Sequence, residues 1–300
     1  MARREWKWTE KQFDKLNKAI QILDELADYK PLTLRQIYYQ FVSKGYIENK
    51  VSEYAMLSKC LKWARIDGYI SWDDMEDRTR VFHDNTGFSD KDQFVTQELD
   101  CFLSRYKRNL LQSQEKYPEL WIEKDALSSI FTRVARWYCV PVVVCKGFSS
   151  ISFQNDFRER LSVKQDKQPL VLYFGDFDPS GVEMLDAMKT TLSDELGVSG
   201  IEFKRVALIQ EDIHTYKLPH NPDALKYTDT RAKKHVLAFG EVAVELDALR
   251  PDILESKIKD AIEGELDIEA FNSEVEKYKS ELDLLNNLKN RVSEFVGNSV

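Results

Sequence analysis

The sequence predicts a mixed α/β protein, with a helical domain at the N-terminus, a parallel β-sheet domain in the middle and a helical region at the C-terminus. Apolar residues recur every three or four positions between residues 9 and 66, which is typical of helices with one buried face. From residue 119 onward, short apolar runs alternate with helical stretches, as in a parallel sheet covered on both faces. A chain of 300 residues, of which 43% are hydrophobic, is long enough for two such domains.

Three helices are expected at the N-terminus. The helical spacing of apolar residues covers residues 9–28, 34–44 and 51–66. Thr9 and Thr33, at the start of the first two segments, have side chains that favour the N-cap position. A proline follows the first segment and a glycine follows the second, and both residue types end helices. The N-terminal part is therefore predicted to contain three consecutive helices joined by short turns.

Two short segments after the third helix are predicted to be strands. Gly68–Trp72 and Thr79–Phe82 are rich in aromatic and β-branched residues, and an acidic turn separates them. Three helices followed by two strands indicate a winged helix-turn-helix domain over residues 1–85, whose third helix enters the major groove of double-stranded DNA. A three-helix bundle that binds protein is the alternative. The expected DNA contacts on the third helix are Lys59, Lys62 and Arg65.

Charge is distributed unevenly along the chain. The net charge of −8 is unusual for a nucleic-acid binder. Residues 1–70, however, contain 13 lysines and arginines against 9 aspartates and glutamates, so this segment is basic and the remainder is strongly acidic. This asymmetry suits a basic DNA reader joined to an acidic catalytic domain, and it equally suits an ordinary solvated surface.

Composition indicates a cytoplasmic protein with no membrane partner. No apolar run reaches the ~18 residues of a membrane helix, and the charged N-terminus has no apolar stretch of the secretory type. The cysteines include no C-x-x-C pair, so we expect reduced thiols and neither disulfides nor a zinc site. The four cysteines are Cys60, Cys101, Cys139 and Cys145.

The middle of the chain is predicted to form the sheet domain. A linker with a connecting helix is expected over residues 86–118, the sheet domain over 119–210, and a loop with a C-terminal helical extension over 211–300. Within this last region the helical pattern covers residues 252–297. The expected strands, with helices between them, are residues 120–122, 142–144, 170–174 and 201–208.

Acidic residues follow two of these strands. Glu123 comes after the first strand, and Asp176 and Asp178 come after the third. Ligands of parallel sheets bind beyond the carboxyl ends of the strands, and two aspartates two residues apart in extended backbone point the same way. Carboxylate oxygens suit Mg²⁺, with Mn²⁺ as the alternative ion, so the three residues are predicted to hold a metal. The alternative for Asp178 is an N-cap role before Pro179.

Three motifs carry a resemblance to a known family. They are Glu-Lys-Asp-Ala at residues 123–126, Lys-Gly-Phe at 146–148 and Asp-Phe-Asp-Pro-Ser-Gly at 176–181. Together they resemble the Toprim domain of the topoisomerase VI A subunit and of the related meiotic double-strand-break transesterases. That family places a winged-helix domain before the Toprim domain, and the order is the same here. The resemblance implies that residues 119–210 form a Toprim domain.

The resemblance also implies a catalytic tyrosine. The family carries Arg-Asp-Ile-Tyr-Tyr in a helix, and this chain has Arg-Gln-Ile-Tyr-Tyr at residues 35–39. By this match Tyr39 is the candidate nucleophile, Tyr38 the second candidate and Arg35 the helper. A homodimer is implied, because the family's tyrosine and metal come from different protomers, and a separate subunit would supply the ATPase. Gln36 replaces the family's acidic residue, and the last ninety residues match no part of the topoisomerase.

The expected activity is Mg²⁺-dependent cleavage of a DNA strand by tyrosine transesterification. In this scheme Arg35 or Lys146 holds a phosphate, and Glu123 either binds the metal or carries a proton to the leaving oxygen. Two alternatives remain. One is a hydrolytic Toprim nuclease that uses metal-activated water, with both tyrosines structural. The other is a DNA-binding module without catalytic activity.

Overall fold

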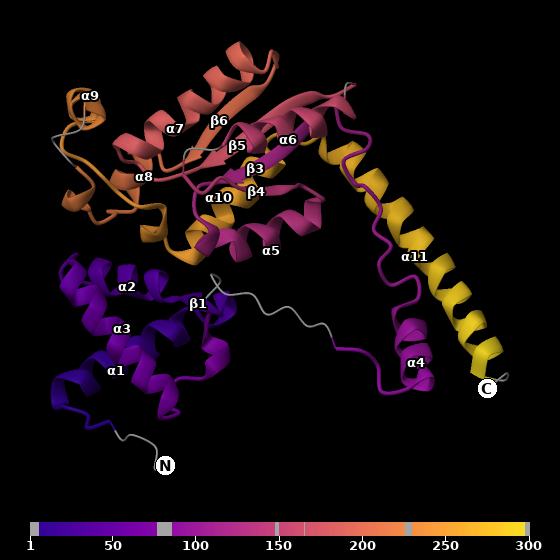
Figure 1. The fold of residues 1–300 in the computed structure, drawn as a ribbon, viewed down its shortest axis with the longest axis horizontal. Coiled ribbons are helices and arrows are strands. Elements are labelled where there is room, and N and C mark those ends of the chain that lie inside the picture. Colours follow the sequence, from indigo (N-terminus) through magenta and orange to yellow (C-terminus); the bar gives the residue numbers. More distant parts are fainter. Residues whose placement is uncertain (1–5, 77–85, 148–149, 165, 226–229, 298–300) are drawn as a thin grey trace.

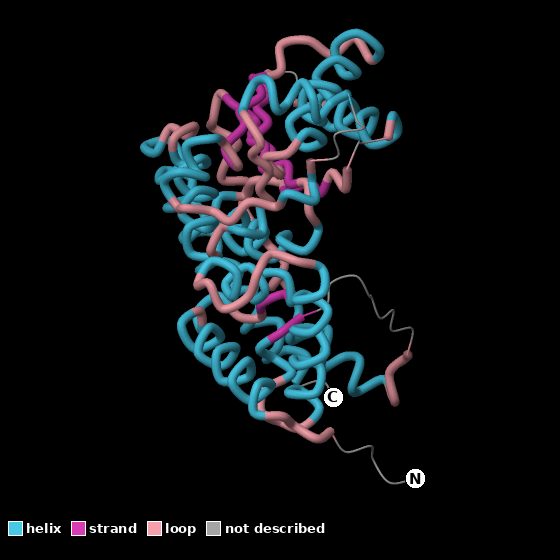
Figure 2. Tube along the Cα trace, turned by 90° about the vertical axis from the view of Figure 1, so that its left-hand side faces the viewer, coloured by secondary structure: helices cyan, strands magenta, loops and turns pink. Residues whose placement is uncertain are grey.

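The computed structural model describes residues 6–76, 86–147, 150–164, 166–225 and 230–297, and its fold is mixed α/β (Figure 1). A group of helices at the N-terminus lies below a part built around a parallel sheet, and the side view in Figure 2 shows these two parts stacked on one another. The mixed α/β class predicted from the sequence is confirmed.

The N-terminal part contains the three predicted helices, α1 (Glu10–Glu25), α2 (Leu34–Ser43) and α3 (Val51–Ile66). Thr9 and Thr33 cap the first two through reciprocal hydrogen bonds with the glutamine three residues later. Gly45, at φ +69°, follows α2 in the left-handed region that glycine adopts without strain. Six consecutive residues of α2, 36–41, are buried, so α2 is the central helix of this part.

The prediction of a first wing strand at Gly68–Trp72 is wrong. Gly68–Ser71 forms the turn that ends α3, in which the backbone N–H groups of Tyr69 and Ile70 donate to the carbonyl of Ala64. A 3₁₀ turn (Trp72–Asp74) follows, and then β2 (Met75–Glu76) pairs in parallel with β1 (Leu32–Thr33). The aromatic and apolar residues that suggested a strand instead belong to the turn that ends α3. The second expected strand, residues 79–82, lies outside the described residues.

A connecting segment leads from the N-terminal part to the sheet. It contains α4 (Lys91–Cys101), which buries none of its residues. Strand β3 (Lys116–Ile122) begins earlier than predicted, because Lys116–Pro118 already pairs with the neighbouring strand. Pro118, which has no N–H to donate, lies where β3 pairs with β5 alone, because the pairing of β3 with β4 begins at Leu120.

The sheet contains β3, β4 (Val142–Val144), β5 (Gln168–Phe174) and β6 (Glu202–Ala207), all parallel and in the order β4-β3-β5-β6. Alternate residues of β3 and β5 point to opposite faces. Leu120, Ile122 and Phe174 pack on one face with α5 (Ser128–Tyr138) and α10 (Pro251–Glu263).

The other face of the sheet is covered by two further helices. Trp121 and Tyr173 pack there with α6 (Ile151–Ser162) and α7 (Pro179–Thr190), and α7 continues into a π-helical turn (Thr191–Glu195). Both faces are therefore buried, as the apolar strands predicted.

The region expected to be loops contains two helices, α8 (Gln210–Thr215) and α9 (Thr230–Phe239). Their apolar pattern is weak because α8 is short and α9 buries only Ala232 and His235. After α9 the chain returns to the sheet, where Val244 forms an antiparallel bridge with Phe177. This return places residues 245–247 beside the end of β5.

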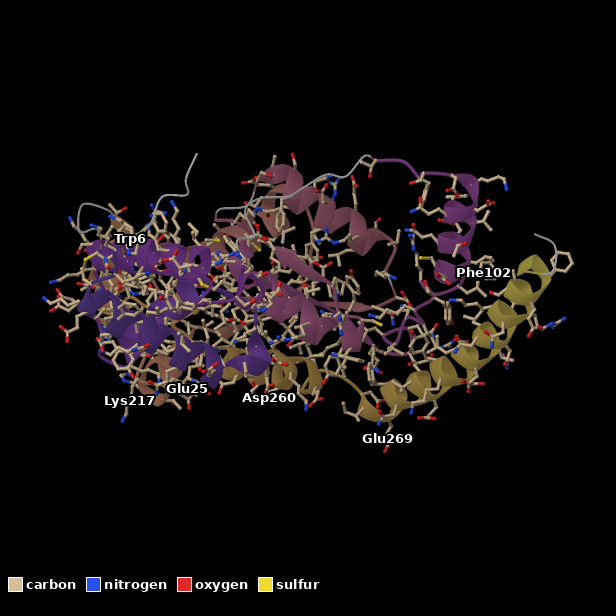
Figure 3. The ribbon with its side chains drawn as sticks, turned by 90° about the horizontal axis from the view of Figure 1, so that it is seen from below. Trp6, Glu25, Phe102, Lys217, Asp260 and Glu269 are labelled. Carbon is tan, nitrogen blue, oxygen red and sulfur yellow. The ribbon has the colours of Figure 1, made fainter. Side chains whose placement is uncertain are left out.

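The C-terminus is helical, as predicted, with α10 followed by the thirty-residue α11 (Ile268–Gly297). Arg108 of the connecting segment donates to Glu274 at 2.6 Å, which anchors the first half of α11. Figures 1 and 3 show α11 projecting from the sheet with α4 beside its far end. None of the described helices is both long and apolar enough to cross a membrane.

Candidate functional site

The ends of β3 and β5 place Glu123 beside Asp176. These strands pair in register up to Ile122 and Phe174, and the Glu123 N–H donates to the Phe174 carbonyl at 3.0 Å. The Glu123 carboxylate then accepts the backbone N–H of Asp176 at 2.9 Å. Burial raises the pKa of Glu123 above its ordinary value, although this hydrogen bond opposes the effect. The predicted proximity of these two chain positions is therefore present in the structure.

Asp178 lies at the start of α7. Its carboxylate accepts the Gly181 N–H at 2.7 Å, and Pro179 is the first helical residue. The N-cap role weighed from the sequence is therefore present, and it leaves the second carboxylate oxygen of Asp178 outside this bond. Because the Asp178 charge also raises the pKa of Glu123, the two carboxylates interact electrostatically.

Gly181 has to be a glycine for this arrangement to form. A β-carbon at this position would lie 2.3 Å from the Asp176 carbonyl oxygen and 3.2 Å from Glu123 Oε2. The missing side chain lets the first turn of α7 approach both strand ends. Gly181 therefore sets the spacing between Glu123 and Asp178.

We predict that Gly181→Ala lowers the free energy of unfolding by ~1–3 kcal/mol, the usual cost of an overpacked site. The measurement is thermal or urea unfolding, with Gly87→Ala as the control, because a β-carbon at Gly87 meets nothing within 4 Å. Equal stability of the two variants would contradict the close approach at Gly181.

Asp176 points away from this pair. Its side chain is 6% exposed, accepts the Leu246 N–H at 2.8 Å and lies 3.0 Å from Lys124 Nζ. Burial raises the pKa of Asp176 to about 7, against the opposing charge of Lys124. The expectation that Asp176 and Asp178 point the same way is wrong, because Asp178 turns to cap α7 while Asp176 turns to Lys124. Within the described ranges, no three histidine, cysteine, aspartate or glutamate side chains are arranged as a metal-ligand group.

Lys124 is the centre of a buried ionic cluster that the sequence did not reveal. Its ammonium lies within 3.0 Å of three carboxylates. The distances from Lys124 Nζ are 2.7 Å to Glu245 Oε2, 2.9 Å to Asp247 Oδ2 and 3.0 Å to Asp176 Oδ2. Burial alone would lower the pKa of Lys124, but the three carboxylates raise it well above its ordinary value. Lys124 therefore carries a positive charge inside the protein.

Glu245 connects this cluster to the N-terminal part. Its carboxylate pairs with Arg35 Nη2 at 3.0 Å and accepts hydrogen bonds from Asn221 and from the hydroxyl of Tyr39. Although burial raises the pKa of Glu245, Lys124 and Arg35 together hold it below its ordinary value. Both residues expected from the tyrosine motif, Tyr39 and Arg35, thus lie one contact away from Lys124.

The two adjacent tyrosines have different environments. The Tyr38 hydroxyl donates to Asn49 Oδ1 at 3.0 Å, and the ring packs against Tyr54. Tyr39 is 2% exposed, and burial together with the Glu245 charge raises the pKa of its hydroxyl. Both tyrosines line a pocket of ≈ 320 Å³ with Arg35 and Glu245, but only the Tyr39 hydroxyl bonds to Glu245. Of the two, Tyr39 is the one that faces the charged cluster.

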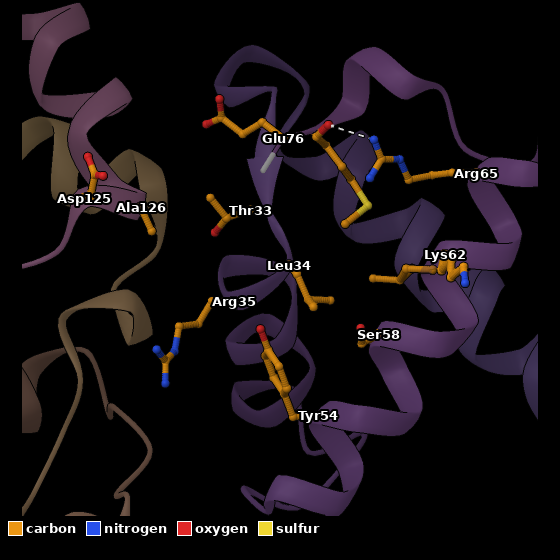
Figure 4. Close-up of a pocket in the computed structure, with 12 residues that line it drawn as sticks. Thr33, Leu34, Arg35, Tyr54, Ser58, Lys62, Arg65, Glu76, Asp125 and Ala126 are labelled. Carbon is orange, nitrogen blue, oxygen red and sulfur yellow. Dashed lines mark hydrogen bonds between the residues drawn. The ribbon is translucent and has the colours of Figure 1, made fainter. Parts of the chain in front are cut away.

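The basic residues of α3 divide into two groups. Lys62 and Arg65 line a pocket of ≈ 410 Å³ together with Arg35, and Asp125 and Ala126 of the sheet part form its opposite wall (Figure 4). Lys146 reaches the same wall, because its ammonium lies 3.0 Å from Asp125 Oδ2. Lys59 instead lies over the ring of Trp6, at 5.0 Å, and does not line this pocket. Three of the expected phosphate contacts, Arg35, Lys62 and Arg65, therefore line one pocket between the two parts, and Lys146 lies beside its wall.

Arg205 of β6 is a further residue that the sequence did not single out. Its guanidinium donates to the backbone carbonyls of Gly175, Asp176 and Gly181, and to that of Leu208 at 2.8 Å. Burial lowers the pKa of Arg205 below its ordinary value. By holding three carbonyls of residues 175–181, Arg205 fixes the loop that carries Asp176 and Asp178.

A comparison with models of known protein families and a comparison with curated proteins both find no match for this chain.

Proposed function

We propose that the protein binds double-stranded DNA and cleaves a strand in a reaction that needs Mg²⁺ or Mn²⁺, with Tyr39 as the nucleophile, in the manner of a Toprim-containing topoisomerase A subunit. One juxtaposition carries the proposal. The carboxylates at the ends of β3 and β5 and the hydroxyl of Tyr39 are joined through Asp176, Lys124 and Glu245. The proposed nucleophile and the proposed metal ligands, distant in the sequence, are thus linked through one ionic cluster of the chain, whereas in the family that the sequence resembles they come from different protomers.

The residues at the strand ends fit a hard divalent cation. Glu123 and Asp178 approach the same turn of α7 and offer carboxylate oxygens, the ligands that Mg²⁺ prefers. Asp176 would become a third ligand of the ion only if its carboxylate moved away from Lys124. When bound, the ion supplies positive charge for the phosphate in the transition state.

Tyr39 would attack the phosphorus of a phosphodiester. A phosphotyrosyl bond forms, the bond to the leaving sugar oxygen breaks, the hydroxyl loses its proton and the leaving oxygen gains one. Glu123 carries a proton only in the alternative in which it does not bind the metal; its raised pKa then brings it closer to neutral pH. Glu245 stays charged and holds the Tyr39 hydroxyl in position, while the half-exposed Arg35 is placed to bind the phosphate.

Cleavage by Tyr39 requires the two parts of the chain to separate. With 2% of its surface exposed, Tyr39 reaches no phosphodiester in this conformation. The contacts that would open include the Arg35–Glu245 ion pair and the hydrogen bond from Asn49 to the His220 carbonyl. Both are polar, and DNA phosphates offer a competing partner for Arg35.

The burial of Tyr39 favours hydrolysis as the second candidate reaction. In that reaction a water molecule activated by the metal attacks the phosphate, and Tyr39 remains a buried partner of Glu245. A DNA-binding module without activity is the third candidate. On the basis of the resemblance we also propose a homodimer, and an ATPase would come from a separate subunit.

Incubation with end-labelled DNA and Mg²⁺ or Mn²⁺ distinguishes these candidates. Transesterification leaves label covalently attached to protein after denaturation. Hydrolysis releases fragments that carry no protein. A salt-sensitive gel shift without cleavage leaves only the binding module and contradicts the proposed activity.

We predict that Lys62→Ala weakens binding to duplex DNA and reduces the slope of log K against log salt by about 1, because one phosphate contact is lost. Lys62 lines the pocket that Arg35 and Arg65 share. Lys18→Ala is the matched control, since Lys18 lies on α1 and pairs with Asp14 at 2.6 Å. If both variants had the same slope of log K against log salt, DNA would not bind at the pocket that Lys62 lines.

A further inference from the structure

The Lys124 ammonium lies at the centre of three carboxylates, and with the lysine in place these side chains, like the others in the described ranges, are not arranged as a metal-ligand group. Three carboxylate oxygens, from Asp176, Glu245 and Asp247, lie 2.7–3.0 Å from its ammonium nitrogen. The three acidic side chains come from two segments of the chain, and all are largely buried. Buried carboxylates repel one another unless a cation compensates them, so this cluster depends on the charge at its centre.

Asp247 differs from the other two carboxylates of the cluster, because Asp176 and Glu245 accept hydrogen bonds and Asp247 is held by charge. Its side chain is 0% exposed, and neither of its oxygens accepts a hydrogen bond from the described part of the chain. Its contact with Lys124, at 2.9 Å, meets the distance for an ion pair without the geometry of a hydrogen bond. A carboxylate in this situation is stabilised by nearby positive charge, which here comes from Lys124 in direct contact and from Arg35 at longer range.

The backbone explains why the lysine reaches this cluster. Lys124 has extended dihedral angles, φ −109° and ψ 122°, and successive side chains of extended backbone point in opposite directions. Glu123 therefore turns toward α7, and Lys124 turns toward Glu245. Asp176 lies between them: its backbone N–H donates to the Glu123 carboxylate, and its own carboxylate forms an ion pair with Lys124.

We propose that the Lys124 ammonium is a resident cation in the place of a second divalent ion, so that the protein works with a single exchangeable metal ion. The position of that single ion, at Glu123 and Asp178, rests on the function proposed above. The cluster of Asp176, Glu245 and Asp247 does not exchange its cation with solution, because the lysine is covalently part of the chain. Removal of the lysine side-chain charge should turn this cluster into a divalent-ion site.

The test is the number of Mn²⁺ ions bound per chain, measured from the loss of the electron paramagnetic resonance signal of free Mn²⁺. We expect the Lys124→Met variant to bind one ion more than the wild type. Lys124→Arg keeps the charge and should bind no additional ion. The double variant with Lys124→Met and Asp247→Asn loses one ligand, and its additional ion should bind at least about tenfold more weakly.

Folding of the Lys124→Met variant gives a second readout. Without metal its three carboxylates lose the central counter-charge and keep only the ion pair of Glu245 with Arg35, so its melting temperature in EDTA should fall well below that of the wild type, and Mn²⁺ should restore it. A folded variant that binds no additional ion would overturn the proposal, and so would a variant that stays unfolded in saturating Mn²⁺. If the wild type binds no ion and the variant binds one, the resident-cation proposal stands and the metal site of the proposed function fails.

Discussion

The Tyr39→Phe variant should form no covalent adduct with DNA, whereas the wild type should form one in the presence of Mg²⁺. The substitution removes only the hydroxyl that we propose as the nucleophile, and the ring remains in its buried position on α2. The hydrogen bond to the charged Glu245 is lost as well, which costs about 1.5–3 kcal/mol of stability. The measurement is the amount of labelled DNA that migrates with the denatured protein.

Tyr38→Phe is the matched control for this prediction. It removes a hydroxyl from the neighbouring residue of the same helix, where the partner is Asn49 on the loop before α3. This variant should retain the adduct. Cleavage that persists without an adduct in both variants and in the wild type would instead favour hydrolysis by a metal-activated water.

The Asp178→Asn variant should lose cleavage by about 10²–10³-fold, the range observed when one group that stabilises transition-state charge is removed. Asparagine caps helices about as well as aspartate, so the hydrogen bond to Gly181 and the start of α7 should remain. The substitution removes the negative charge that a divalent ion needs and leaves the fold in place. Cleavage rates should be compared at several Mg²⁺ concentrations.

Asp178→Ala provides the comparison that separates the two roles of this residue. It removes both the charge and the cap, so it should lose cleavage and also ~0.5–2 kcal/mol of stability. An Asp178→Asn variant with wild-type cleavage would show that Asp178 is only a helix cap.

The sequence predicted the site residues that are linked to regular elements. Glu123, Asp176 and Asp178 follow buried strands, and parallel strands bring their carboxyl ends to one edge. Tyr39 and Arg35 were reached through a resemblance, since nothing in the periodicity of α2 separates a reactive tyrosine from a packed one. The same periodicity correctly placed α1, α2 and α3.

The direction of the Asp176 carboxylate was beyond the reach of sequence patterns. It depends on Lys124 and on the N–H of Leu246, which lies seventy residues further along the chain. Glu245 and Asp247 occupy a return segment with no helical or strand periodicity, so no local pattern marks them. Their role follows only from the bridge between Phe177 and Val244, a tertiary contact.

A crystal of the protein grown with Mn²⁺ and measured for anomalous scattering tests the central claim most directly. We predict one strong peak bonded to carboxylate oxygens of Glu123 and Asp178, at roughly 2.0–2.2 Å, the range for small divalent ions. We also predict no peak among Asp176, Glu245 and Asp247, where Lys124 lies. A saturated crystal with no ion beside Glu123 and Asp178 would contradict the account.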